Sequence, residues 1–158
     1  MNRPIGSNST QLFPNVLFFY EVERLLRQTL SVILRVQGGS MRPFLREGDT
    51  VRLVPFVTER LQRWDIVLAQ TTFGVLLHRV VSIRNNRILL AGDANRRLEE
   101  TDSKHIIGIV DAAWRRETPL NTQTIPLLVL WYGLRPFRGY LLCIYERLQW
   151  LRNVIKHN

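Results

Sequence analysis

From residue 15 onward, apolar and polar residues follow a helical pattern. The spacing of the apolar residues places them on one face of a helix. Pro14 and Asn15 supply a start signal. The pattern predicts an N-terminal helical segment over residues 15–34, in which the helix covers about residues 15–30 and a short strand then enters Gly38-Gly39. The apolar positions recur at three- and four-residue steps: Val16, Phe19, Val22, Leu26, Leu30 and Ile33.

The middle of the chain changes to short apolar or β-branched runs separated by turn residues such as Gly and Asn. Such runs predict strands. The segment Ile83–Ile88 carries Asn85-Asn86 at its centre and predicts a tight hairpin, because Asn tolerates left-handed backbone angles. We therefore expect a compact, mainly β, mostly antiparallel fold at residues 36–117. The expected strands are "DTVRLVPF", "WDIVLAQ", "GVLLHRVVSI", "NRILLAGD" and "KHIIGIVDAAW".

The tail at residues 119–158 returns to a helical pattern. Its apolar face is interleaved with aromatic residues and with Arg135 and Arg138. Aromatic residues mixed with arginine suit a membrane interface, and they suit a helix packed on the core equally well. The expected face consists of Leu141, Ile144, Tyr145, Leu148, Leu151 and Ile155.

Length and composition narrow the class of protein. A chain of 158 residues, 46% of them hydrophobic, indicates a single folded domain, 1–158. The net charge is +9, carried by 20 arginines and two lysines. This excess favours an acidic partner such as an anionic membrane surface. The cations are scattered along the chain and no helix-turn-helix precedes the β region, so a nucleic acid is not the expected partner.

The sequence predicts neither a metal nor another cofactor. Three histidines and the single Cys143 have no zinc-binding spacing. No apolar run follows Arg3, so no signal peptide is expected. The most apolar segment, Ile125–Leu134, has half of the roughly 20 residues that a membrane span needs. We expect a cytoplasmic protein, either free or held at the periphery of a membrane.

Ser40 is the first candidate for chemistry. A serine hydroxyl is a weak nucleophile and needs a positioned base. A serine–lysine pair would need Lys104 or Lys156, and Lys156, the third residue from the end of the chain, is an unpromising base. His78 lies within a predicted strand and has a suitable intrinsic pKa. An acid that fixes the imidazole is available at Asp93, after the next strand. Taken singly, each residue has a structural alternative: a turn at Ser40 and Asp93, a hydrogen-bonded core residue at His78.

Five segments stand in order between Val36 and Val110: "GGSMRPFLREGD", "RWDIVLAQ", "LLHRVVSI", "LLAGDAN" and "IIGIV". Together they resemble the successive conserved boxes of signal peptidase I and its relatives, a superfamily that includes the self-cleaving repressors of the bacterial SOS response. The likeness covers nearly half of the chain. Trp64 departs from it, because relatives carry glycine there.

The resemblance implies a serine peptidase with a β-rich catalytic core of the signal-peptidase type at residues 36–117. It places Ser40 as the nucleophile and His78 as the general base, as in the histidine-base subtype. It implies Asp93 as the acid that orients His78, with Asp102 as the second choice. The oxyanion would be held by the backbone around Gly38, Gly39 and Ser40, in a loop shaped by Met41 and Pro43.

The expected reaction is acyl transfer that removes a leader or signal segment from a precursor peptide or protein, with small side chains before the cut as the family implies. Two alternatives remain open. One is a self-cleaving transcription regulator, because the chain contains Ala91-Gly92, the kind of bond that the repressors cleave in themselves, although here it lies downstream of the nucleophile. A catalytically inactive module that only binds peptides is the other alternative.

Overall fold

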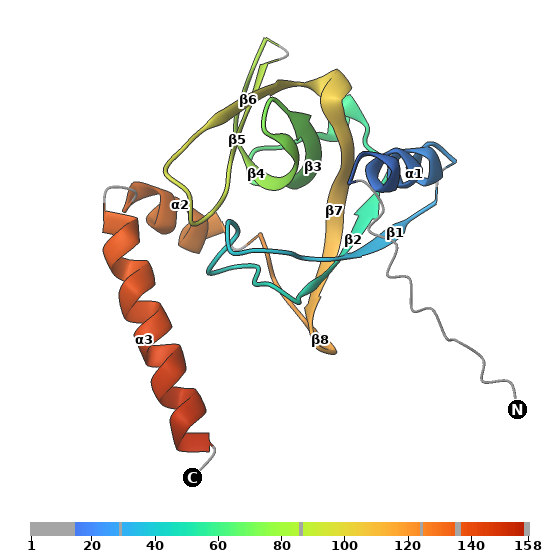
Figure 1. The fold of residues 1–158 in the computed structure, drawn as a ribbon. Coiled ribbons are helices and arrows are strands. Elements are labelled where there is room, and N and C mark those ends of the chain that lie inside the picture. Colours follow the sequence, from blue (N-terminus) through green and yellow to red (C-terminus); the bar gives the residue numbers. More distant parts are fainter. Residues whose placement is uncertain (1–14, 29, 86, 124, 135–136, 157–158) are drawn as a thin grey trace, which may run out of the picture.

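The computed structural model describes residues 15–28, 30–85, 87–123, 125–134 and 137–156. It is built on one antiparallel sheet whose strands follow the order β1-β2-β7-β3-β4-β5-β6, with β8 paired to β7. The sheet curls strongly, so that the strands surround a common interior (Figure 1). A mainly β, antiparallel fold with flanking helices is thus confirmed.

The strands are β1 (Val32–Arg35), β2 (Thr50–Val54), β3 (Ile66–Thr71), β4 (Gly74–Arg84), β5 (Arg87–Ala91), β6 (Glu99–Asp102), β7 (Ile106–Arg115) and β8 (Thr118–Pro119). The helices are α1 (Asn15–Arg27), α2 (Ile125–Gly133) and α3 (Arg138–Lys156), with 3-10 turns at Thr58–Arg60 and Ser103–His105.

The predicted strands of the middle region are all present, and the hairpin between β4 and β5 closes where expected. Ile83 pairs with Ile88 and Arg84 with Arg87, and Asn85 has a positive φ of 45°. Strands β6 and β8 were not predicted from the pattern, and β6 is the longer of the two. Its sequence is Glu-Glu-Thr-Asp, and acidic residues are depleted in strands.

Helix α1 is shorter than the sequence predicted. It ends at Arg27, and Val32 and Ile33 belong to strand β1. Their β-branched side chains favour the extended backbone, and pairing with β2 joins Val32 to Leu53. The expected helical positions Leu30 and Ile33 are exposed, at 48% and 64%.

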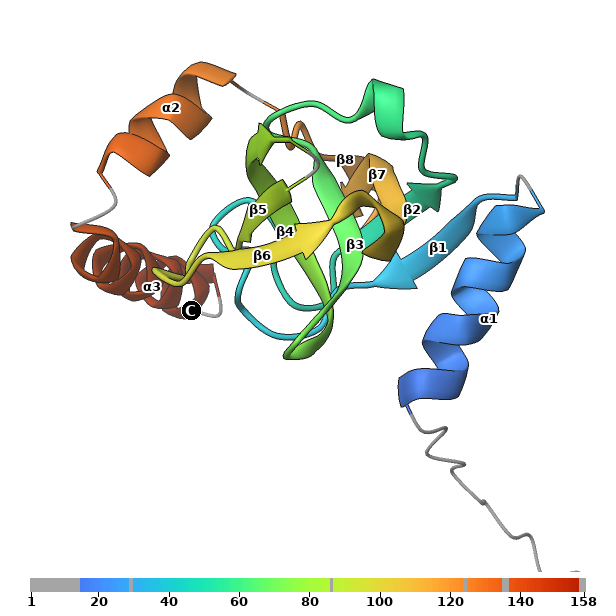
Figure 2. The same ribbon diagram turned by 90° about the horizontal axis from the view of Figure 1, so that it is seen from above.

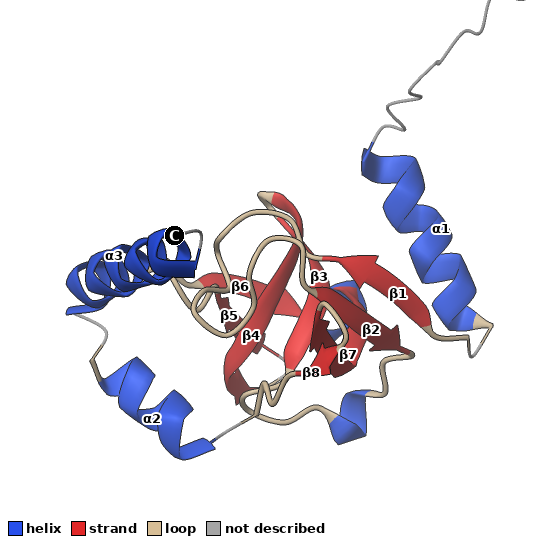
Figure 3. Ribbon diagram, turned by 90° about the horizontal axis from the view of Figure 1, so that it is seen from below, coloured by secondary structure: helices blue, strands red, loops and turns tan. Residues whose placement is uncertain are grey.

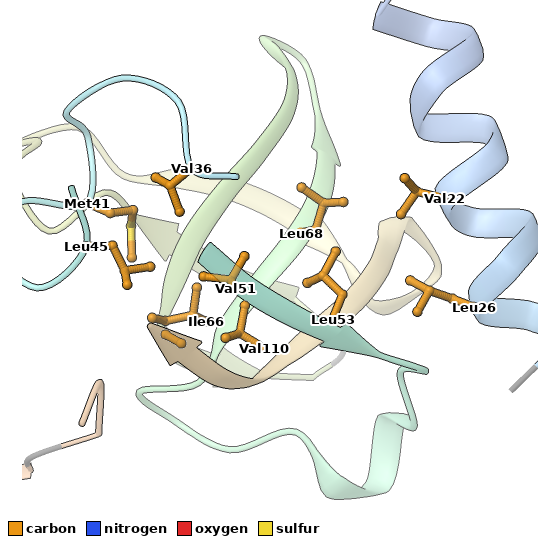
Figure 4. Close-up of a cluster of buried hydrophobic side chains, with 11 residues drawn as sticks. Val22, Leu26, Val36, Met41, Leu45, Val51, Leu53, Ile66, Leu68 and Val110 are labelled. Atoms are coloured by element: carbon orange, nitrogen blue, oxygen red, sulfur yellow. The ribbon is translucent and has the colours of Figure 1, made fainter. Parts of the chain in front are cut away.

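The main hydrophobic core lies between α1, the curled sheet and the loop that carries Ser40 (Figure 4). Val22 and Leu26 enter it from α1, and Met41 and Leu45 enter it from the loop. Leu45 is fully buried and Met41 is 2% exposed. The loop is therefore fixed by two buried side chains, one of them next to Ser40.

Helices α2 and α3 lie on the side of the sheet away from α1 (Figures 2 and 3). Helix α2 inserts the fully buried Leu128 against the domain. Of the predicted α3 face, Leu141 and Tyr145 are half-buried, whereas Ile144 and Leu148 are exposed; Leu151 and Ile155 lie outside the described side chains. In the described part of the chain, no helix combines the length and the apolar character needed to cross a membrane.

Candidate active site

The loop between β1 and β2 holds Ser40 in a turn closed by its own backbone. Val36 N–H donates to Asp49 O at 2.8 Å and Gly48 N–H donates to Val36 O at 2.9 Å, so the two ends of the loop are joined. Gly38 has φ +74°, a left-handed conformation that disfavours any side chain. Gly38 is thus the member of the double glycine that the turn leading into Ser40 requires.

Asp49 fixes the exit of this loop. It is 3% exposed, and its carboxylate accepts from the backbone N–H of Arg46 at 2.8 Å. The Arg115 guanidinium donates to both of its oxygens, at 2.9 and 2.7 Å. This paired, bidentate geometry compensates the burial of the carboxylate. The Gly-Asp pair at the end of the first sequence box therefore supports the loop and takes no part in its chemistry.

His78 lies in the centre of β4 and is 2% exposed. Its Nδ1 is 2.7 Å from Oε2 of Glu99 on β6, a side chain that is itself 8% exposed. An ionised Glu99 carboxylate only accepts hydrogen bonds, and opposite that form Nδ1–H of His78 is the donor. The lone pair of a neutral imidazole is then at Nε2, as a general base requires.

Strand register explains why Glu99 reaches His78 across strand β5. Val80 pairs with Leu90, and Leu90 pairs with Glu99. Residues directly opposite in antiparallel strands point to the same face, so these three share one face. His78, two residues before Val80, has its side chain on that same face.

Gly92, directly after β5, contacts the Ser40 loop. Arg79 pairs with Ala91, the last residue of β5, so Gly92 follows the residue opposite Arg79. A Cβ on Gly92 would lie 2.6 Å from the carbonyl oxygen of Ser40. The N–H of Ala94 donates to that same oxygen at 2.8 Å. The main chain of Ser40 thus occupies the space that a side chain at position 92 would fill.

Asp93 does not orient His78, contrary to the expectation from the sequence. It is completely buried, and the Arg79 guanidinium donates to both of its oxygens at 2.8 Å. The hydroxyl of Tyr132 donates to Oδ1 at 2.9 Å, and the indole of Trp131 donates to the Asp93 backbone carbonyl at 2.7 Å. Because strand side chains alternate, Arg79 points to the face opposite His78. Asp93 joins β4 to α2.

Asp102, the second choice, is also separate from His78. It lies at the far end of β6, opposite Arg87, and its carboxylate is 3.6 Å from Lys104 Nζ and 42% exposed. Glu99 is the acid that the sequence reasoning passed over. Its segment, Glu-Glu-Thr-Asp, is polar at every position and lacks the alternation of apolar and polar residues that indicates a strand.

The buried Arg79 is shared by several segments around the site. Besides Asp93, its Nη1 donates to the carbonyls of Trp64 and Thr122, each at 2.9 Å, and its guanidinium lies 5.2 Å from the ring centre of Phe44. Trp64 has φ +82°, a conformation natural to the glycine of the resembling family.

The carboxyl of Asp65 lies close to this buried group. Burial raises its pKa, against the backbone hydrogen bond from Gln62 and the charge of Arg79, which both lower it.

An apolar groove of about 520 Å³ adjoins Ser40. Side chains from three elements form its walls: Phe18 and Phe19 of α1, Leu34 of β1, and Val75 and Leu77 of β4. Such concave, mainly apolar surfaces with a few polar groups are typical of ligand sites. Among the residues that the structure describes, no cluster of three His, Cys, Asp or Glu side chains is arranged to hold a metal ion.

Comparison with known proteins adds no assignment. Neither a protein-family model nor a curated protein sequence matches the chain. A function for this protein can therefore be inferred only from the sequence boxes, the His78–Glu99 contact and the contact of the Ser40 loop with Gly92.

Proposed function

We propose that this protein is a serine endopeptidase that removes a leader or signal segment from a precursor peptide or protein. The observation that carries the proposal is the buried hydrogen bond between His78 and Glu99. The Ser40 main chain lies against Gly92, which directly follows strand β5 between the strands of His78 and Glu99. A histidine held by a carboxylate near a serine is the arrangement that activates a hydroxyl for attack.

In the proposed reaction, Ser40 Oγ attacks the carbonyl carbon of the scissile bond while Nε2 of His78 accepts the hydroxyl proton. The imidazolium returns this proton to the leaving amine, and a water molecule then hydrolyses the acyl-enzyme with His78 again as base. Glu99 stabilises the imidazolium and holds its tautomer. The oxyanion is stabilised by backbone N–H groups of the loop at Gly38, Gly39 and Ser40.

The apolar groove supports a peptide substrate. It extends from Ser40 along the β1 and β4 walls, so an extended segment on the acyl side of the cut would place apolar side chains between Phe19 and Val75. Bound there, the segment would hold its carbonyl near the Ser40 hydroxyl. Holding the two reacting groups together in this way lowers the barrier to attack.

Self-cleavage is the weaker alternative. The Ala91-Gly92 bond belongs to the end of β5, both of its residues are buried, and Ala91 is paired with Arg79. Although the Ser40 main chain lies against Gly92, a peptide bond held at the end of the sheet cannot take the orientation that attack requires unless the strand unpairs.

Reaction with a fluorophosphonate probe, followed by mass spectrometry of the modified peptide, tests the proposal. We expect modification at Ser40 in the wild type and none in Ser40→Ala or His78→Ala, with Ser82→Ala as the matched control that keeps it. Incubation with candidate precursor peptides should give one cut that Ser40→Ala lacks. Equal cleavage by Ser40→Ala, or an unmodified Ser40, would leave only a peptide-binding module.

A further inference from the structure

Helix α3 carries a stripe of apolar side chains that faces away from the domain. Its described members are separated by four residues, so they share one side of the helix. Each is at least two-fifths exposed: Tyr140 75%, Ile144 43% and Leu148 56%. Phe137, directly before the helix, is 64% exposed. A helix that packs on a core buries such a stripe, and α3 does not.

The contacts of α3 with the domain use a different side. Tyr145 accepts a hydrogen bond from Arg46, and Glu146 accepts one from Nη1 of Arg42 at 2.6 Å. Both arginines belong to the loop that carries Ser40. Polar contacts thus attach α3 to this loop and leave the apolar stripe uncovered.

Helix α2, on the same side of the molecule, also packs on the domain with one side and leaves an apolar side exposed (Figures 2 and 3). It buries Leu128, while Trp131 and Tyr132 reach Asp93. Its opposite side is equally apolar and open, with Leu127 at 50% and Leu130 at 59% exposure, and Leu134, directly after the helix, is 36% exposed. Exposed apolar surface on two neighbouring helices is typical of a surface that meets a partner.

The charge of this region identifies the partner. From Ile125 to Asn158 the sequence has five cations, Arg135, Arg138, Arg147, Arg152 and Lys156, and a single acid. That acid is Glu146, which Arg42 already neutralises. Arg147 and Arg152 are exposed and flank the apolar stripe on either side. A second copy of the chain would bring like charges together, whereas anionic headgroups complement them.

We propose that the open sides of α2 and α3 form a lipid-binding surface that docks the protein on an anionic bilayer. The apolar stripe enters the boundary between headgroups and acyl chains, and Arg147 and Arg152 extend along its flanks to the phosphates. Because Arg42 and Arg46 join α3 to the Ser40 loop, docking holds that loop close to the membrane surface. The inference does not depend on the proposed peptidase activity.

Cosedimentation with lipid vesicles tests this surface. Wild type should bind vesicles of phosphatidylcholine containing phosphatidylglycerol and should bind pure phosphatidylcholine vesicles weakly. Ile144→Asn with Leu148→Asn should weaken binding about tenfold or more, and Arg147→Gln with Arg152→Gln by up to about thirtyfold at low salt. The matched control is Leu17→Asn with Tyr20→Asn on α1. These two side chains are at least as exposed as Ile144 and Leu148, and their substitution should not change binding.

The outcomes separate the alternatives. Added salt should weaken the binding of wild type, and Ser40→Ala should bind as wild type does. Binding that both α3 variants retain, or no cosedimentation at all, would overturn the proposal. A wild-type dimer in light scattering that Ile144→Asn with Leu148→Asn dissociates would assign the surface to a second copy. Circular dichroism of each variant shows whether it is folded.

Discussion

Nδ1 of His78 lies 2.7 Å from Oε2 of Glu99, and the two side chains meet over strand β5, which separates their strands in the sheet. Both are almost completely buried. A contact of this kind forms only when three strands are correctly paired, so it exists in the folded protein alone. It is also the contact on which the proposed chemistry depends.

Glu99→Gln should reduce the rate of Ser40 modification and of peptide cleavage by about 10²- to 10⁴-fold. The amide can donate to Nδ1 and thereby favour the tautomer whose Nε2 carries the proton, which cannot accept one from Ser40. Glu100→Gln is the matched control, because Glu100 pairs with the exposed Arg87. Unchanged probe kinetics in Glu99→Gln would remove Glu99 from the mechanism.

Gly92→Ala should impair the site without breaking the His78–Glu99 contact. The added methyl group would lie 2.6 Å from the Ser40 carbonyl oxygen, so the loop must move. A displacement of about 1 Å costs about a hundredfold in rate. Gly133→Ala is the control, since its Cβ would meet nothing within 4 Å. The comparison is made by probe kinetics, and equal rates for both variants would contradict the placement of Ser40 against Gly92.

Asp93→Ala should act mainly on stability. It leaves the guanidinium of Arg79 buried without its carboxylate, which costs about 3–5 kcal/mol in the free energy of unfolding. Asp111→Ala removes an exposed pair with Arg52 and should cost at most about 1 kcal/mol. Urea denaturation measures both. A stable Asp93→Ala protein that cannot be modified at Ser40 would instead assign Asp93 to the chemistry.

The Trp64→Gly variant should be more stable than the Trp64→Ala variant. In a regular strand the order would be reversed, because glycine weakens a strand relative to alanine. Both lose the buried indole ring, which packs on Tyr132 with centres 5.0 Å apart. Only alanine must adopt φ +82° with a Cβ, at a cost of about 1–2 kcal/mol. Glycine should therefore be the more stable variant in urea. A more stable alanine variant would mean that residue 64 leaves the positive-φ region.

The acid that contacts His78 could not be predicted from the sequence. The sequence box Gly-Asp-Ala-Asn favoured Asp93, and the acidic segment that contains Glu99 lacks the pattern of a strand. Alternation along a strand decides which face a side chain takes, and a shift of one residue reverses it. Only the pairing of β4, β5 and β6 determines that Glu99 shares the face of His78.

Local patterns were sufficient for much of the rest. The β-branched runs, the Asn85 turn and the glycines before Ser40 depend on backbone preferences of neighbouring residues, which the sequence carries by itself. The end of α1, the partner of Asp93 and the direction of the α3 stripe depend on contacts between residues far apart in the chain. Those contacts are set by how strands pair and helices dock, and tertiary structure alone decides them.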